Sequence, residues 1–383
     1  MTPPIGDDGF RTAFAQEAAS LGRFTVVVLG RTGVGKSTLV NAVFGESLAE
    51  TGIGAPVTRT SHLYSREGVG LAVVDTRGIE IGEDAGALLA DLRALVAHSR
   101  TRGQEEQIHI AWFCVQAGDL RIQDGERAVM AELHRLGVPV LLVMTKVPQV
   151  DGRNHPDAVA FHHAIQAMGL PVLGGRAWPV MAVGDPFAGW PAHGLRDLVE
   201  QTRLAAPAGV EAAFVAAQRV DSEAKAKASG KAVAAAAAQA AAAAATPIPF
   251  ADAALLVPIQ LRMMSRIALL HNVPVDRATL LALGSVAATT GAGRSLATSL
   301  VKLIPGAGTV AGGLIGAGVA STVTAAMGAA WIGVCTRYGS DGVVGTVVFE
   351  PGVLQKAFAE EMGRRLRGRG RGRDPHRPTG DAR

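Results

Sequence analysis

Cysteine is scarce in this sequence, and its first residues contain no long apolar segment. The two cysteines among 383 residues are Cys114 and Cys335, each inside an apolar run, so a disulfide framework and a cysteine metal site are excluded. Residues 1–22 include Asp7 and Glu17 and lack the apolar stretch of a secretory signal. We therefore expect a cytoplasmic protein whose cysteines are small core residues.

Outside the C-terminal end the chain has no net positive charge. The formal net charge is +4, but residues 364–383 contain eight arginines and two aspartates, so the rest of the chain is slightly acidic. The basic character belongs to a tail rich in Gly and Arg, residues 361–383, whose low apolar content predicts disorder. Binding of RNA or acidic lipid by this tail and a solubilising role both remain open.

Composition changes along the chain. Strand-like and helix-like segments alternate up to about residue 205, whereas Ala and Gly dominate beyond it, and the length suits about two domains. The predicted organisation is an N-terminal amphipathic helix (1–22), a first domain (23–205), an Ala-rich helical linker (206–245), an α-helical domain that is a candidate for membrane association (246–360) and the disordered tail (361–383).

The N-terminal helix is predicted from apolar residues at helical spacing. Phe10, Phe14, Ala18 and Leu21 would share one face of such a helix. We expect this face to pack against the first domain; a role at a membrane surface is the alternative.

The most informative motif is GRTGVGKST at residues 30–38. It follows the apolar run FTVVVL and precedes LVNAVFG, so a strand, a glycine-rich turn and a helix start occur in the order that a phosphate-binding loop requires. Backbone N–H groups of such a loop bind phosphate, Lys36 would neutralise the β and γ phosphates, and Ser37 would reach a Mg²⁺ ion. A chance glycine-rich turn is the alternative, because the chain has 47 glycines. The residues predicted to bind the nucleotide in this motif are Gly30, Arg31, Thr32, Gly33, Val34, Gly35, Lys36, Ser37 and Thr38.

Short apolar runs alternate with helix-like stretches after this loop. Such runs are typical of strands buried on both faces of a parallel sheet, so we predict an α/β fold with a doubly wound, mostly parallel sheet, followed by an all-α domain rich in Ala and Gly. The predicted strands cover 24–29, 70–76, 109–116, 138–146 and 176–183, and the predicted helices include 85–99 and 125–137. In the loop at 118–126 we expect Arg121 to pair with Asp119 or Asp124.

Further residues suit magnesium and the γ phosphate. Asp75 ends a predicted strand, where its carboxylate can hold the metal shell while the Gly78 N–H approaches the γ phosphate. The turn-rich segment 52–64 offers Thr58 and Thr60 for closing over the metal, and we favour Thr58; an ordinary loop hydrogen bond is the alternative.

These elements resemble the Era-like and dynamin-like GTPases over residues 23–190. The shared order is a GxxxxGKS loop, a switch threonine (Thr58), a DxxG element (Asp75 and Gly78) and an N/T-K-x-D base-reading element (Thr145 and Lys146). The resemblance implies a P-loop NTPase fold, GTP and Mg²⁺ as cofactors and hydrolysis of the β–γ phosphoanhydride. It further implies Lys36, Thr58, Asp75 and Gly78 as catalytic residues, and Ser37, Thr58 and Asp75 as metal ligands.

Three positions depart from this family pattern. Arg77 replaces the usual proline of the DxxG element, and Ile79 stands where a Ras-type GTPase has its water-orienting glutamine. Slow intrinsic hydrolysis, or activation by a homodimer or a partner protein, is therefore expected. Pro148 replaces the guanine-reading aspartate, with Asp151 three residues further on. The choice of GTP over ATP is favoured but stays open.

The second half of the chain predicts helices. Residues 211–245 favour one or two long helices interrupted near Gly230. Residues 303–336 carry no charge, and small residues recur at every fourth position beside an equally regular bulky stripe, which predicts a tightly packed helical hairpin. The hairpin either inserts at a bilayer or forms the core of a soluble bundle. The segment 246–273, together with this hairpin, resembles an uncharacterised bacterial domain found after Era-like GTPase domains.

The sequence thus predicts a magnesium-dependent GTP-binding and hydrolysing switch with slow turnover and a helical output domain, with guanine nucleotide as its ligand. The alternatives are a nucleotide-binding scaffold or membrane-surface organiser without useful hydrolysis, and a ribosome- or RNA-associated GTPase, which we favour least. Membrane lipid bound through 303–336 is a further candidate partner.

Overall fold

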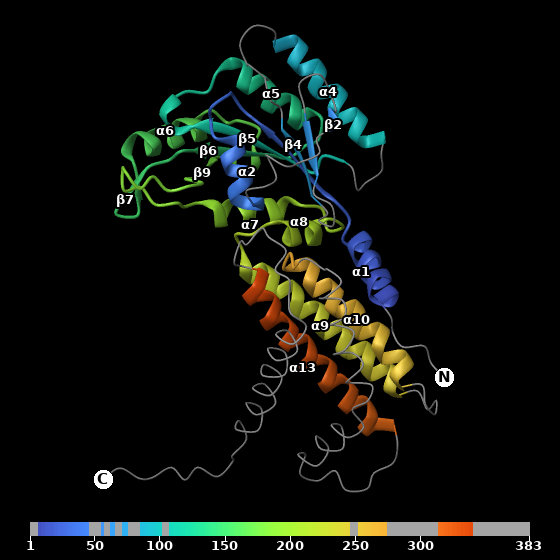
Figure 1. Ribbon diagram of the computed structural model, residues 1–383. Helices are drawn as coiled ribbons and strands as arrows, with labels where there is room; N and C mark the ends of the chain where they lie inside the picture. The colour runs from blue at the N-terminus through green and yellow to red at the C-terminus, as the bar shows by residue number, and fades with distance from the viewer. Residues whose placement is uncertain are drawn as a thin grey trace, which may run out of the picture. The chain divides into compact units, whose positions relative to one another are not determined.

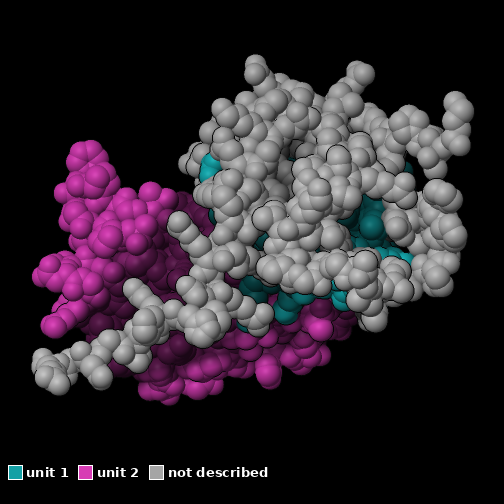
Figure 2. Space-filling model, turned by 90° about the horizontal axis from the view of Figure 1, so that it is seen from below, with its two compact units in different colours: residues 1–17, 225–383 teal, residues 18–224 magenta. Residues whose placement is uncertain are grey.

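The computed structural model describes residues 7–45, 55–56, 62–65, 71–75, 85–101, 107–245, 252–273 and 313–339 (Figure 1). The chain divides into two compact units, which are coloured separately in Figure 2. We call residues 18–224 the sheet unit, and residues 1–17 with 225–383 the helical unit.

The sheet unit is built on seven strands in the order β2-β3-β4-β1-β5-β6-β9. Neighbouring strands from β4 to β9 pair in parallel, whereas β2 and β3 add antiparallel strands at one edge. The predicted α/β fold with a mostly parallel sheet is therefore confirmed. The strands are β1 (Phe24–Leu29), β2 (Ala55–Pro56), β3 (His62–Ser65), β4 (Leu71–Asp75), β5 (Ile110–Gln116), β6 (Val140–Thr145) and β9 (Ala177–Pro179).

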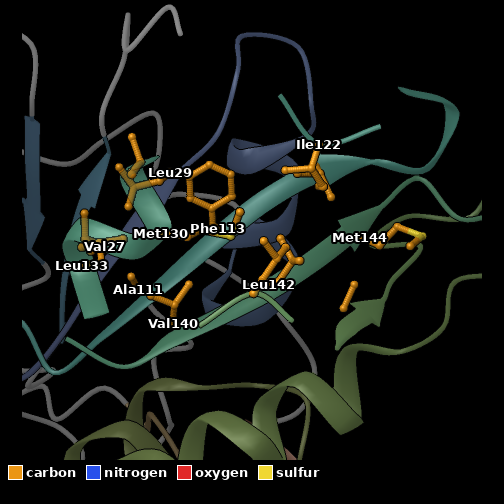
Figure 3. Packing of buried hydrophobic residues seen from close by; sticks show 14 of the residues in the cluster. Val27, Leu29, Ala111, Phe113, Ile122, Met130, Leu133, Val140, Leu142 and Met144 are labelled. Carbon is orange, nitrogen blue, oxygen red and sulfur yellow. The ribbon is translucent and has the colours of Figure 1, made fainter. Parts of the chain in front are cut away.

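Helices cover both faces of this sheet (Figure 1), which explains why its parallel strands are mostly apolar. Val26 and Val28 of β1 belong to one buried cluster, whereas Val27 and Leu29 belong to the cluster of the opposite face. Figure 3 shows the second cluster, where Phe113 lies near Met130. The helices of the unit are α2 (Lys36–Phe44), α4 (Ala85–Thr101), α5 (Asp124–Arg135), α6 (Pro156–Ala167), α7 (Leu195–Ala205) and α8 (Glu211–Ala217).

Two features of the sheet unit differ from the predicted strands. The last parallel strand is only three residues long, because the segment predicted as 176–183 leaves the sheet after Pro179. A two-stranded hairpin that was not predicted follows β6, formed by β7 (Gln149–Val150) and β8 (Arg153–Asn154). Asp151 and Gly152 form its turn, both with positive φ.

The helical unit contains α10 (Asp252–Leu270), α13 (Gly313–Gly339) and most of α9 (Ser222–Ala245). Met264, Ile267, Met327, Trp331 and Cys335 are at most 1% exposed in its core. The Trp331 indole N–H donates to the Met264 carbonyl oxygen at 3.0 Å. Helices α10 and α13 are therefore joined by packing and by a buried hydrogen bond.

One expectation about helices was wrong, and one held in part. Helix α9 continues through Gly230, and the interruption lies instead at residues 218–221, where the Gln218 side chain donates to the Asp221 carbonyl and accepts from the Asp221 N–H. Helix α1 (Asp7–Leu21) was expected to pack on the first domain. Its Leu21 is buried and belongs to the sheet unit, whereas Phe14 packs against the core of the helical unit and Glu17 pairs with Arg262 and Arg266.

The uncharged segment 303–336 contains one long helix where a hairpin was predicted. Residues 313–336 belong to α13, while 303–312 lie outside the described residues. Among the described residues, none of the helices combines the length and hydropathy that crossing a bilayer requires. In α13 the described members of the small stripe (Ala320, Thr324, Gly328) are buried, as are Met327, Trp331 and Cys335 of the bulky stripe, whereas Val323 of that stripe is half-buried.

Candidate functional site

The glycine-rich loop curls between the end of β1 and the start of α2. Gly30, Gly33 and Gly35 have φ values of 133°, 82° and 100°, a region that residues with a Cβ rarely adopt. A Cβ on Gly30 would lie 2.3 Å from the Cys114 carbonyl oxygen of the neighbouring strand. The loop therefore starts in close contact with the backbone of β5, which only glycine allows.

The N-terminus of α2 opens toward solvent. Its N-cap residue Gly35 is left-handed and offers no side chain to cap the helix, and the first turn carries no acidic residue. Ser37 and Thr38 are exposed. The first N–H groups of α2 and the positive end of its dipole are therefore available to an anion.

Lys36 folds back over the loop. Its Nζ donates to the Gly30 carbonyl oxygen at 2.8 Å and to the Arg31 carbonyl oxygen at 3.0 Å. An ammonium has three donors in a compact head, so a phosphate entering the loop can replace these carbonyls as its acceptor. The structure thus places the predicted phosphate-neutralising lysine directly at the loop.

The end of β6 lies against the same loop. Thr145 Oγ1 donates to the Val34 carbonyl at 2.5 Å and approaches the Val115 carbonyl at 3.1 Å. Lys146 has φ 52° and its Nζ donates to the Gly33 carbonyl at 2.7 Å. The two predicted base-site residues, far away in sequence, are thus brought next to the phosphate loop.

The remaining predicted residues are only partly placed. Thr58 and Gly78 lie outside the described residues. Asp75 ends β4 and pairs in register with Val28 of β1, so its backbone lies at the same edge of the sheet as the loop, although its side chain is not described.

A magnesium ion fits the one predicted donor whose side chain is described. The Ser37 hydroxyl is a hard oxygen ligand at the exposed start of α2, and Mg²⁺ commonly uses one or two protein ligands plus phosphate oxygens. Among the described residues no group of three His, Cys, Asp or Glu side chains forms a metal cluster.

Pro148 stands where the family pattern has its guanine-reading aspartate, and the β7–β8 hairpin follows it. Its carbonyl accepts the His155 N–H at 2.9 Å at the base of this hairpin, and the neighbouring Val147 carbonyl lies 2.9 Å from His193 Nε2. Asp151 is exposed at the hairpin turn, three residues after Pro148.

An ion-pair cluster beside the loop was not predicted. Arg31 binds Asp119, which was expected to pair with Arg121, and Arg31 Nε lies 3.5 Å from Glu126 Oε1. The hydrogen bond to Asp119 raises the pKa of Arg31, and burial raises the pKa of Glu126. No spacing rule connects residues this far apart, so the sequence carried no signal for the pair.

The sheet order and the glycine-rich loop at the start of α2 are the features of a phosphate-binding P-loop domain. Residues 25–146, about a third of the chain, match the family model described as "50S ribosome-binding GTPase".

The solved structures that the chain resembles include the following three. A probable GTP-binding protein engB is 16% identical, with 47% of this chain and 97% of that chain covered at a TM-score of 0.33. A variant of Era from Aquifex aeolicus bound to GDP and AlF4⁻ is 19% identical, with 49% and 57% covered at a TM-score of 0.32. Translation elongation factor SelB from Methanococcus maripaludis is 15% identical, with 48% and 33% covered at a TM-score of 0.29. With TM-scores this low, the three similarities carry no argument about function.

Proposed function

We propose that the chain binds GTP together with Mg²⁺, hydrolyses it slowly and changes the state of its helical unit as it does so. The observation that carries this proposal is the open N-terminus of α2 beside Lys36, Thr145 and Lys146. Such a constellation of backbone donors and two ammonium groups suits a nucleoside triphosphate.

Each residue has a role in this proposal. Backbone N–H groups of the loop hold the phosphates, and Lys36 exchanges its two carbonyl acceptors for phosphate oxygens. Ser37 and Asp75 would hold Mg²⁺, which supplies charge neutralisation between the β and γ phosphates. Contacts of Thr58 with the metal and of the Gly78 N–H with the γ phosphate would order the loops that contain these residues.

Slow turnover follows from Ile79. An aliphatic side chain can neither accept nor donate a hydrogen bond, so it cannot orient water as glutamine does. A second copy of the chain or an activating protein would then have to complete the site.

Equilibrium binding tests the proposal. Fluorescent GTP and ATP analogues are titrated with Mg²⁺ into the wild-type protein, Lys36→Ala and the matched control Lys227→Ala, which removes an exposed lysine of the helical unit. We expect GTP binding that Lys36→Ala abolishes and Lys227→Ala preserves, with slow phosphate release. Equal or tighter ATP binding would overturn the guanine assignment, and tight binding with no phosphate release would favour the scaffold.

A ribosome- or RNA-associated GTPase is a second candidate. It is favoured by the description of the matching family and by the arginines of residues 364–383. Co-sedimentation with 50S subunits or RNA should then fall with rising salt and disappear when residues 364–383 are deleted. Binding that is unchanged by the deletion would remove the tail from this proposal.

Cytoplasmic location and membrane binding through residues 303–336 are further proposals. The uncharged composition of the segment supports membrane binding, while the burial of most described residues of both stripes of α13 supports the soluble bundle. Flotation with anionic vesicles, with and without GTP, separates the two.

A further inference from the structure

Arg31 is a residue of the phosphate loop whose side chain is already engaged elsewhere. Its guanidinium donates to Asp119 Oδ2, and its Nε lies 3.5 Å from Glu126 Oε1. Asp119 ends the turn that follows β5, and Glu126 lies in the first turn of α5. One loop side chain therefore connects to two separate segments beyond β5.

Glu126 is fixed in place and buried. One of its oxygens, Oε2, accepts the Gln123 N–H at 2.8 Å as part of a capping box at the start of α5. The other, Oε1, is buried and has no hydrogen-bond partner, and the residue is 1% exposed. A buried carboxylate needs a counter-charge, which Arg31 supplies at 3.5 Å, with a smaller contribution from Arg121.

The backbone of Arg31 connects this cluster to Lys36. The Arg31 carbonyl oxygen accepts from Lys36 Nζ at 3.0 Å and from the Val34 N–H at 3.4 Å. Ion pairs that fix the Arg31 side chain therefore also fix the position of its carbonyl oxygen, which accepts the hydrogen bond from Lys36. The adjacent Gly30 is packed against β5, so the loop is anchored at two successive residues.

We propose that Arg31 is a positioning residue, which Asp119 and Glu126 clamp so that the phosphate loop keeps its shape with or without nucleotide. The clamp does not touch the phosphates: Arg31 acts through the loop backbone and Lys36. This inference rests on the proposed function for its effect on nucleotide, but not for its effect on the loop.

The direction in which Asp119→Asn changes the rate of nucleotide dissociation distinguishes the clamp from a direct contact between Arg31 and phosphate. If Arg31 is a clamp, Asp119→Asn and Arg31→Met both loosen the loop, and both speed dissociation of a fluorescent GTP analogue, by about tenfold for the loss of a charged hydrogen bond. If Arg31 instead turned to the phosphates, Asp119→Asn would release it and slow dissociation. Slower dissociation of Asp119→Asn would overturn the proposal.

Three further variants complete the kinetic experiment. Arg31→Lys keeps the charge but can reach only one carboxylate well, so it should rescue dissociation in part. In the double variant Arg31→Met with Asp119→Asn the two effects should not add, because both break the same contact. The matched control Arg196→Met breaks an exposed ion pair with Glu223 of the same sheet unit and should leave dissociation unchanged. Additive effects in the double variant would contradict the clamp.

Amide hydrogen exchange of residues 30–38 in the nucleotide-free protein tests the clamp without any ligand. Asp119→Asn and Glu126→Gln should speed exchange in this loop several-fold while the strands of the sheet keep their protection. Faster loop exchange in a protein that binds no nucleotide would keep the clamp and overturn only the proposed function. Unchanged loop exchange would overturn the clamp even if GTP binds.

Discussion

The sheet unit and the helical unit build their cores from different materials. Fully buried large side chains such as Trp112, Phe24 and Phe113 fill the sheet unit, where two helical layers enclose a sheet. The helical unit relies more on small residues: Ala268 and Ala330 are fully buried, and Gly328 comes so close to Val233 that a Cβ would lie 2.5 Å from it. One core gains stability from buried area per side chain, the other from close approach of helices.

Each unit nevertheless contains one tryptophan with a similar role. Trp112 Nε1 donates to Thr202 Oγ1 at 3.0 Å, and Trp331 Nε1 donates to the Met264 carbonyl at 3.0 Å. Both indoles are at most 1% exposed. The units can therefore be compared through equivalent substitutions.

The largest expected effect comes from removing these tryptophans. Trp112→Ala and Trp331→Ala should each lower the free energy of unfolding of its own unit by about 3 to 5 kcal/mol, since a large cavity and an unpaired polar group remain. Denaturant unfolding followed by circular dichroism measures this. Phe187→Ala, which truncates a fully exposed ring, is the control and should change little. A single variant that destabilises both units equally would break the comparison.

Alanine substitution of one glycine in each unit compares contact with a rigid backbone and contact with side chains that can move. An alanine at Gly30 meets the Cys114 backbone and a positive φ, so Gly30→Ala should cost about 4 kcal/mol and remove nucleotide binding. An alanine at Gly328 meets only the side chains of Val233 and Met263, so Gly328→Ala should cost about 1 kcal/mol after the gain in helix propensity. Thermal unfolding of both variants checks the difference.

Gly318→Ala is the matched control in the same helix. Among the described residues, no atom beyond the neighbouring backbone of α13 itself lies within 4 Å of the added Cβ, so Gly318→Ala should stabilise α13 by about 1 kcal/mol. Destabilisation by Gly318→Ala would mean that the helical unit packs differently from the structure described.

Acid should weaken the helical unit through a buried histidine. Burial, with Lys225 nearby, lowers the pKa of His271 from 6.5 to about 4. Between these values the unfolded chain binds the proton that the folded chain rejects, so stability is lost as pH falls from about 6.5 to about 4, by at most roughly 3 kcal/mol. His271→Gln should flatten this pH dependence of the unfolding free energy.

The sheet unit has its own acid-sensitive group at lower pH. Hydrogen bonds from Arg135 and Arg93 lower the pKa of Glu132 from 4.5 to about 2, so its contribution is present above 4.5 and is lost as pH falls toward 2. A pH profile of the helical unit that stays flat between pH 6.5 and 4 would contradict the assignment of His271.

The smallest effect concerns α1. Glu17 pairs with Arg262 and Arg266, of which Arg262 is 60% exposed, so Glu17→Gln should destabilise the helical unit by about 1 kcal/mol. Gln16→Ala, at the exposed neighbouring position, is the control. A loss confined to the sheet unit would show that α1 belongs with that unit, as the sequence had suggested.

Local patterns made the sheet unit predictable. The order of strand, loop and helix at residues 24–44 follows from apolar runs and glycine spacing, which act between neighbours in sequence. The β7–β8 hairpin was missed because its strands are two residues long and lack alternation. The Arg31 cluster was missed because its partners are brought together only by the sheet.

The helical unit was less predictable for a related reason. Ala and Gly allow close helix packing both in water and in lipid. The stripes of α13 therefore predicted contact between helices, but not whether this contact lies in a membrane or in a soluble bundle. Gly230 suggested a helix break, but a glycine costs only about 1 kcal/mol in a helix that other contacts hold.

Each unit contains one buried cysteine whose alkylation rate can be measured. Cys114 lies in the sheet unit and Cys335 in the helical unit, and both side chains are fully buried. Burial raises the pKa of Cys335, which further slows attack by its thiolate on a reagent. The rate at which each thiol is alkylated in the intact protein therefore measures how often its own unit opens. A nucleotide that stabilises one unit alone would slow alkylation of the cysteine in that unit and leave the rate at the other cysteine unchanged.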